Sequence, residues 1–241
     1  MIKPDILVVH PLHLDYPLWR YNMIKYKDYF RSLTIVFSDH NMKKDYSNFI
    51  RVQLPFANFV DYKGDKPDWR DGAVNWGLNT MPEDGYVLFL EQDFFWTDGF
   101  LNKVLQDQNE FFYFKEGGRI HPAFALVKRS MINKTSRDFS AYPDTFGDHF
   151  SKFFNELSLG ISINTLGTKN RKDYFHMNGL SQEYMNFLND QPFYNKDNFT
   201  YYNNECRYLP IEHHPEFYQM EWLIAAKFGV PKESFLQRFF P

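Results

Sequence analysis

The chain has 241 residues, a formal net charge of −3 and a pI near 6.2, so nothing in its charge favours nucleic acid or an anionic membrane surface as a partner. Its one cysteine, Cys206, excludes an internal disulfide and indicates a reducing compartment. No apolar run approaches the roughly 20 residues that span a bilayer, and the N-terminus lacks a signal peptide, so we expect a soluble cytoplasmic protein.

Strand and helix patterns alternate along residues 1–96. Apolar β-branched runs predict strands, whereas apolar residues at helical spacing predict helices. We expect strands at Ile6–Val9 and Leu33–Phe37, and a short third strand at Ile50–Leu54 that Pro55 closes. Asn58–Pro67 is expected to be a polar loop. We expect one helix from Pro17, with Asp15 as its N-cap, to about Phe30 and another over Asp68–Met81. This alternation predicts a mostly parallel sheet with helices on both faces.

The segment Tyr86–Trp96 is the centre of this pattern. Tyr86–Leu90 is a continuous apolar run that predicts a strand buried on both faces. The acidic cluster Glu91-Gln92-Asp93 follows it, and on an extended strand Glu91 and Asp93 would share a face. Paired carboxylates resist ionisation unless a cation lies between them, and Mg²⁺ or Mn²⁺ prefers such oxygen ligands. We therefore predict a metal–phosphate site at the carboxyl edge of the sheet.

The remainder of the chain continues as one domain without a linker or repeat. We expect strands at Phe111–Phe114, Ala123–Val127 and Ile161–Leu166, helices from Asp98 to about Leu105 and over Tyr142–Leu157 and Pro215–Phe228, and a long loop at Asn189–Asn204. We interpret residues 1–96 as a nucleotide-sugar-binding half and residues 97–241 as an acceptor-binding half. Aromatic residues make up 20% of the chain, and those not needed in the core would suit flat ligands such as bases or sugar rings.

The segment Gly72–Trp96 resembles the nucleotide-sugar half of GT-A fold glycosyltransferases, particularly family 2. Those enzymes carry an Ala-x-Asn-x-Gly-Leu helix, an acidic-Gly turn, an apolar strand and an Asp-x-Asp motif. Here the helix pattern is matched by Ala73, Asn75, Gly77 and Leu78, the turn by Asp84-Gly85, and the acidic motif by Glu91-Gln92-Asp93. The resemblance implies a Rossmann-like α/β sheet that binds a nucleoside-diphosphate sugar with Mn²⁺ or Mg²⁺.

The resemblance also implies roles for individual residues. Nucleotide contacts fall on His10, Pro11, Asp39, Asn75, Glu91 and Gln92, and metal ligation falls on Asp93, Glu91 and His176. The segment His121–Ile132 resembles the acceptor-side strand of the family, and the catalytic base that deprotonates the acceptor hydroxyl falls on Asp148, with Asp144 as its rival. The implied reaction is transfer from a UDP-sugar to a glycan or another hydroxyl compound. We expect inversion, with retention as the open alternative, since a retaining enzyme would not need this base.

This sequence departs from the family in two places, and other functions remain open. Glu91 replaces the usual first Asp, and the acceptor strand lacks its glycine, with Phe124 inside it. The alternatives are a non-catalytic nucleotide-sugar or glycan-binding protein and a sugar-nucleotide nucleotidyltransferase. The second is disfavoured because no glycine-rich loop follows the first strand. A metallohydrolase built on His213, His214 and Glu216 is the weakest alternative. The oligomeric state is not indicated.

Overall fold

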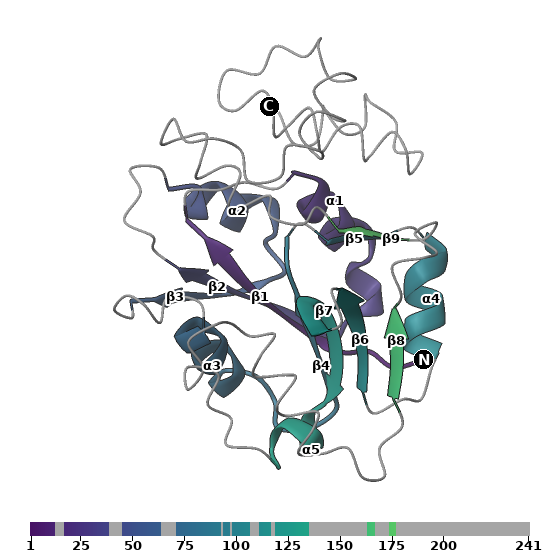
Figure 1. Ribbon diagram of the computed structural model, residues 1–241. Coiled ribbons are helices and arrows are strands. Elements are labelled where there is room, and N and C mark those ends of the chain that lie inside the picture. Colours follow the sequence, from purple (N-terminus) through teal and green to yellow (C-terminus); the bar gives the residue numbers. More distant parts are fainter. Residues whose placement is uncertain are drawn as a thin grey trace, which may run out of the picture.

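A seven-stranded mixed sheet forms the centre of the molecule (Figure 1). The computed structural model describes residues 1–12, 17–38, 45–63, 71–92, 94–96, 98–106, 111–116, 119–134, 163–166 and 174–176. The strands follow the order β3-β2-β1-β4-β7-β6-β8 and comprise β1 (Asp5–Pro11), β2 (Ser32–Ser38), β3 (Asn58–Tyr62), β4 (Tyr86–Leu90), β6 (Phe111–Glu116), β7 (Arg119–Lys128) and β8 (Ile163–Leu166). All of these strands except β7 run in one direction. The predicted mostly parallel α/β fold is therefore confirmed.

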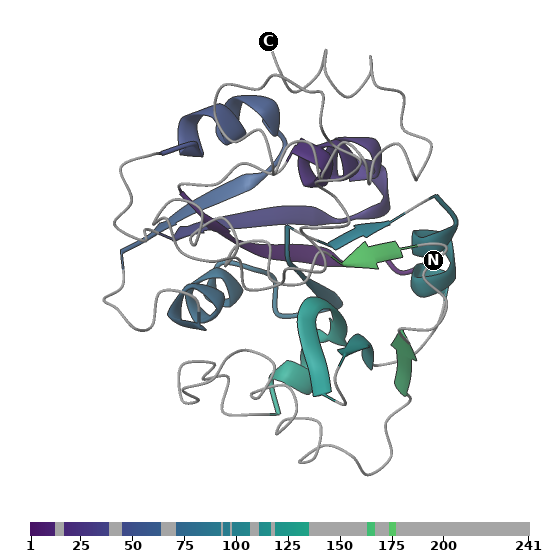
Figure 2. The same cartoon turned by 45° about the horizontal axis from the view of Figure 1, so that its top comes forward.

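Helices cover both faces of this sheet (Figures 1 and 2). They are α1 (Pro17–Lys25), α2 (Ser47–Gln53), α3 (Asp71–Asn79), α4 (Asp98–Gln106) and α5 (Arg129–Ile132), with a 3-10 turn, η1, at Lys27–Tyr29. Buried side chains of α1, α2 and α4 share one hydrophobic cluster, and those of α3 and α5 share the other. The sheet therefore separates two apolar layers.

Strand β4 belongs to both layers, as its apolar run predicts. Leu88 and Leu90 pack into the cluster under α1 and α4, whereas Val87 and Phe89 pack into the cluster under α3. Each of these four side chains is at most 3% exposed. Strand β4 lies between parallel β1 and antiparallel β7, and an apolar layer covers each of its faces. It therefore has no solvated face, and this burial explains why its sequence does not alternate.

The prediction of a strand at Ile50–Leu54 is wrong, because this segment lies in and just after helix α2. Ile50 and Leu54 are fully buried, while Val52 between them is 74% exposed. In a strand these residues would share one face, whereas helical spacing puts the middle residue opposite the other two. The main-chain NH of Ser47 donates to Asp45 Oδ1 at 2.8 Å, which supports the start of the helix.

The third strand is instead β3, inside the segment predicted as a polar loop. It is the outermost described strand on its side of the sheet and pairs in parallel with β2 alone. Its residues are exposed or half-buried, and the Phe59 ring stacks on Phe37 at 5.8 Å. An edge strand of this kind tolerates the exposed polar residues Asn58 and Asp61, and these residues hid it from a search for apolar runs.

Helix α3 approaches the sheet unusually closely at Gly77. A Cβ atom there would lie 2.5 Å from Leu7 Cδ1 and 2.7 Å from Val36 Cγ2. Ala73, one turn earlier, is also fully buried. The small residues of the Ala-x-Asn-x-Gly-Leu pattern therefore let the helix backbone rest on β1 and β2.

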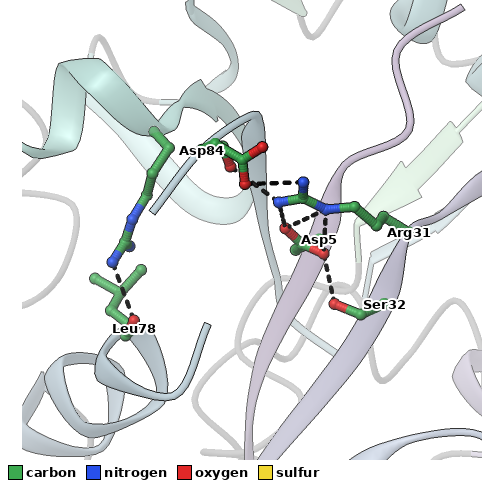
Figure 3. Close-up of polar contacts among 6 residues, drawn as sticks. Asp5, Arg31, Ser32, Leu78 and Asp84 are labelled. Carbon is green, nitrogen blue, oxygen red and sulfur yellow. Dashed lines mark hydrogen bonds and ion pairs between the residues drawn. The ribbon is translucent and has the colours of Figure 1, made fainter. Parts of the chain in front are cut away.

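The amino edge of the sheet is fixed by a guanidinium between two acids (Figure 3). Arg31 donates to buried Asp5 through Nε, at 3.0 Å from each carboxylate oxygen, and through Nη2, and it bonds Asp84 Oδ1 at 2.9 Å. Ser32 Oγ donates to Asp5 at 2.6 Å. The Asp5 hydrogen bond, partly opposed by burial and helped by Asp84, raises the pKa of Arg31 above its usual value. This cluster joins the starts of β1 and β2 to the turn before β4.

The remaining expected elements are only partly described. Strands β6, β7 and β8 confirm the predicted strands at 111–114, 123–127 and 161–166, with shifted ends. The helices expected at 142–157 and 215–228 and the loop expected at 189–204 lie outside the described residues. Among the helices that are described, none has the length and apolarity to cross a membrane.

Candidate functional site

The carboxyl ends of the parallel strands meet at one edge of the sheet. Pro11 at the end of β1 is in register with Ser38 at the end of β2, and Ser38 is in register with Tyr62 at the end of β3. The loop after β1 is tied to this edge because Leu12 N donates to Ser38 O at 3.1 Å and Tyr46 N donates to Leu12 O at 2.8 Å. Open α/β sheets bind ligands at such an edge.

His10 contributes packing rather than an exposed ligand at this edge. Its side chain is fully buried, with ring contacts to Trp19 at 5.3 Å and Phe37 at 5.9 Å. Nδ1 lies 2.8 Å from Pro11 O, a distance at which its N–H donates to that carbonyl. Among the described residues after β1, the half-buried Pro11 and Leu12 are available to a ligand at this edge.

The chain turns at Glu91 and Gln92 instead of continuing as an extended strand. Glu91 N still donates to Ala123 O of β7 at 3.1 Å, but Phe94 N then donates back to Glu91 O at 3.3 Å. The argument that spacing alone puts Glu91 and Asp93 on one strand face is therefore wrong. Glu91 is half-buried at this turn, and Asp93 itself lies outside the described residues.

Gln92 has a structural contact that the sequence did not reveal. Its side chain is 6% exposed, and Nε2 donates to Val9 O of β1 at 2.5 Å. This bond fastens the acidic turn after β4 to the end of the neighbouring strand. The family resemblance implied a nucleotide contact for Gln92, and nothing in the sequence indicated this tether.

A small second sheet brings the late histidine segment to the acidic turn. Strand β5 (Phe94–Trp96) pairs antiparallel with β9 (Tyr174–His176), and Phe94 lies directly opposite His176. Opposed Cα atoms in such a pair are about 5 Å apart, so β9 lies directly beside the strand that follows the acidic turn. Two segments predicted to supply metal ligands thus meet, although they are about eighty residues apart in sequence.

Other predicted site residues are placed apart or not described. Asn75 is half-buried on α3, which covers the sheet face opposite the one against which His10 packs. Asp39 follows directly after β2, but it lies outside the described residues, as do Asp144 and Asp148. Within the described part of the chain no three His, Cys, Asp or Glu side chains form a metal-binding group. The site roles of these residues therefore stay predictions.

The acceptor-like segment His121–Ile132 runs along the sheet from the carboxyl ends of the parallel strands to their amino ends. Ala123, in β7, accepts the hydrogen bond from the Glu91 turn, whereas fully buried Arg129 lies at the far edge. Arg129 Nη2 donates to Leu78 O at the end of α3, at 3.0 Å, and lies 3.4 Å from Glu83 Oε1. The buried position of Arg129 therefore supports a structural role and not contact with an acceptor.

The strand order and the acidic turn that follows the central strand define a GT-A type of fold. Among solved structures, the chain is similar to S. aureus TarS residues 1–349, with a TM-score of 0.53 and 13% identity over 99% of this chain and 81% of that one. It is also similar to the mannosyltransferase PcManGT from Pyrobaculum calidifontis in complex with GDP-Man and Mn²⁺, with a TM-score of 0.51 and 15% identity over 98% and 74% of the two chains.

A third similar structure is glucosyl-3-phosphoglycerate synthase from Mycobacterium tuberculosis in complex with phosphoglyceric acid. Its TM-score is 0.51, with 12% identity over 96% of this chain and 81% of that chain. No family model matches the sequence. No curated protein matches it either. The comparisons thus confirm the expected GT-A fold, and membership of family 2 stays a prediction.

Proposed function

We propose that this protein is a metal-dependent glycosyltransferase that moves a sugar from a nucleoside diphosphate, UDP in the first instance, to an acceptor hydroxyl with inversion. The observation that carries the proposal is the pairing of Phe94 with His176. It sets a histidine beside the acidic turn at the carboxyl edge, where a diphosphate would be bound. The GDP-Man and Mn²⁺ bound to the similar mannosyltransferase support a cation and a sugar nucleotide here.

In this mechanism, Asp93, His176 and Glu91 would hold a divalent cation. When bound, such a cation would supply the positive charge that offsets the negative charge developing on the leaving diphosphate. The tether from Gln92 to Val9 keeps the acidic turn in place before the donor binds, so little reorganisation is needed. Asp39 would contact the base or ribose at the end of β2.

The acceptor hydroxyl must lose its proton as it attacks the sugar from the face opposite the diphosphate. A carboxylate can take that proton as a general base. We assign this role to Asp148, with Asp144 as the rival. The first half of β7 lies beside the acidic turn, and this contact supports an acceptor site on the same side of the sheet.

The test compares Asp93→Ala with Asp84→Ala, a matched removal of an acid at the opposite edge of the sheet. Hydrolysis and transfer are measured with UDP- and GDP-sugars in Mn²⁺, with and without EDTA. Loss of an electrostatic stabiliser costs about a hundredfold or more in turnover, so Asp93→Ala should lose activity while Asp84→Ala keeps it. Wild-type turnover in Asp93→Ala would refute the metal site. Wild-type protein that binds sugar nucleotides without turnover would indicate the non-catalytic alternative.

The base is tested separately with Asp148→Asn and Asp144→Asn. The variant that removes the base should lower turnover while the donor affinity, measured by thermal shift with Mn²⁺, is retained. Unchanged turnover in Asp148→Asn would exclude Asp148 from the mechanism.

A further inference from the structure

The main-chain hydrogen bonds described at the acidic turn are long. Phe94 N donates to Glu91 O at 3.3 Å, and Glu91 N donates to Ala123 O of β7 at 3.1 Å. Both distances exceed the roughly 2.9–3.0 Å that is most common for such bonds. The position of the turn therefore depends also on the side chains that pack at its two ends.

Phe94, the first residue after the turn, is anchored in an aromatic cluster with Phe100 and Phe124. Its side chain is fully buried, and its ring centroid lies 5.1 Å from that of Phe124 in β7 and 5.9 Å from that of Phe100 in α4. Phe100 and Phe124 also meet each other edge to face, with centroids 5.2 Å apart. These geometries are favourable for aromatic pairs. Rings from β7 and α4 therefore hold the chain where it leaves the turn.

Phe124 also lies beside the residue from which the chain enters the turn. It is in register with Leu90, the last residue of β4, and directly opposed residues of neighbouring strands have adjacent side chains. Both side chains are at most 3% exposed and belong to the hydrophobic cluster beneath α1 and α4. Ala123, which accepts the bond from Glu91 N, immediately precedes Phe124. Phe124 therefore adjoins both ends of the turn.

A bulge in β7 brings Phe124 to this position. Strand β7 lies between β4 and β6 (Figure 1). Two consecutive residues of β6 are in register with Ala125 and His121 of β7, so residues 122–124 have no counterpart in β6. These residues serve β4 instead, through the register of Phe124 and the carbonyl of Ala123. Bulges of this kind are common next to functional sites, where they direct a side chain.

We propose that Phe124 is a positioning residue of the candidate cation site, because its ring packs beside both ends of the acidic turn and keeps the turn where a cation is to be bound. This inference rests on the proposed function, since it concerns the same site. Phe124 acts through the chain, as Asp93 is bonded directly to Phe94, which the aromatic cluster holds. If loss of the ring left the turn in its binding position for about a tenth of the time, affinity for the cation would fall about tenfold.

The test compares Phe124→Leu with Phe89→Leu in the full chain. Phe89 is a matched control, because it is 2% exposed, immediately precedes Leu90 in β4 and packs into the apolar layer on the opposite face of the sheet. Hydrogen exchange of the Glu91 amide is measured relative to that of the amides within β4, without metal or nucleotide. Loss of global stability accelerates both, whereas loss of local support accelerates the Glu91 amide alone.

We expect the relative exchange rate of the Glu91 amide to rise about tenfold in Phe124→Leu and to stay at the wild-type value in Phe89→Leu. Phe124→Met keeps most of the side-chain volume, so its rate should lie between those of the wild type and Phe124→Leu. The same comparison can be made with Phe124→Met if Phe124→Leu does not fold.

Calorimetric titration of the same proteins with Mn²⁺ in the presence of UDP or GDP separates this inference from the proposed function. Phe124→Leu should need about tenfold more Mn²⁺ for half-saturation, and Phe89→Leu should match the wild type. The inference is refuted if the Glu91 amide of Phe124→Leu exchanges as in the wild type, if Phe89→Leu accelerates it equally, or if the Mn²⁺ affinity of Phe124→Leu is unchanged. If the wild type itself binds no Mn²⁺ with either nucleotide, the proposed function fails, and exchange alone decides whether Phe124 holds the turn.

Discussion

The two acids that hold Arg31 offer a direct test of how burial sets the strength of an ion pair. Asp5 is 1% exposed and Asp84 is 78% exposed, yet both bond the same guanidinium (Figure 3). Replacing either acid by Asn preserves its volume and removes its charge. Asp5→Asn also sets an amide against the Arg31 donors and the Ser32 hydroxyl, which then lack a full acceptor.

The magnitudes follow from the two environments. Breaking a fully buried pair costs about 3–5 kcal/mol; because Arg31 is 36% exposed and retains Asp84, we expect about 2–3 kcal/mol for Asp5→Asn. An exposed pair contributes about 0–1 kcal/mol, so Asp84→Asn should change the free energy of unfolding by less than about 1 kcal/mol. For a chain of this length, the first loss lowers the Tm by roughly 4–12 °C.

Urea and thermal unfolding of both variants measure this difference. The raised pKa of Arg31 implies a contribution to stability that is complete below the ordinary pKa of an arginine and is lost only as the pH rises above it. Arg31 therefore adds no pH dependence to the comparison between about pH 6 and 9. Equal losses in the two variants, or a larger loss in Asp84→Asn, would refute the reasoning from burial.

Three further predictions concern packing, the site tether and alkaline pH. Gly77→Ala should destabilise the fold by about 1 kcal/mol in urea because its new Cβ meets Leu7 and Val36. Gly99→Ala in α4, with open space around it, should be neutral or slightly stabilising, and the reverse order would contradict the packing argument. Gln92→Ala should lower the free energy of unfolding by about 1 kcal/mol because the carbonyl of half-buried Val9 loses the hydrogen bond from Gln92, and an unchanged urea midpoint would show that the tether is not significant. Burial raises the pKa of Tyr113 above 10.0, so the contribution of its neutral phenol to stability is present below about pH 10 and is lost above it. The Tm of Tyr113→Phe should therefore fall less than that of the wild type between about pH 9.5 and 11.5, and equal falls would contradict this sign.

Local patterns were sufficient for the parts of the fold that are buried on both faces. Tyr86–Leu90 was predicted with the bounds that β4 has, because a strand in the middle of a sheet needs apolar side chains at every position. The prediction of secondary structure failed for segments that are buried on only one side. Ile50 and Leu54 fit either period over so short a run, and β3 carries Asn58 and Asp61 because it lies at an edge.

The candidate site was predictable in its position but not in its contacts. Strand ends can be located from the sequence, so the edge and the acidic turn were found. The burial of His10 and the Gln92 bond to Val9 depend on packing between segments far apart in the chain. The pairing of β9 with β5 involves only three residues on each side, too few to carry a periodic signal.

Strand β7, the reversed strand among those described in the large sheet, has a consequence for how this protein could change. Phe124 of β7 is opposite Leu90 at the end of β4, so residues 119–123 run on past that end, paired largely with β6. The ladder closes with Glu116 opposite Arg119, four residues beyond Ala123, which accepts the hydrogen bond from Glu91 N. A hairpin tip in this position can gain or lose residues without altering any other strand register. Evolution could therefore reshape this hairpin while the strands beneath it are inherited unaltered, and under the proposed function such a change would exchange one class of acceptor for another.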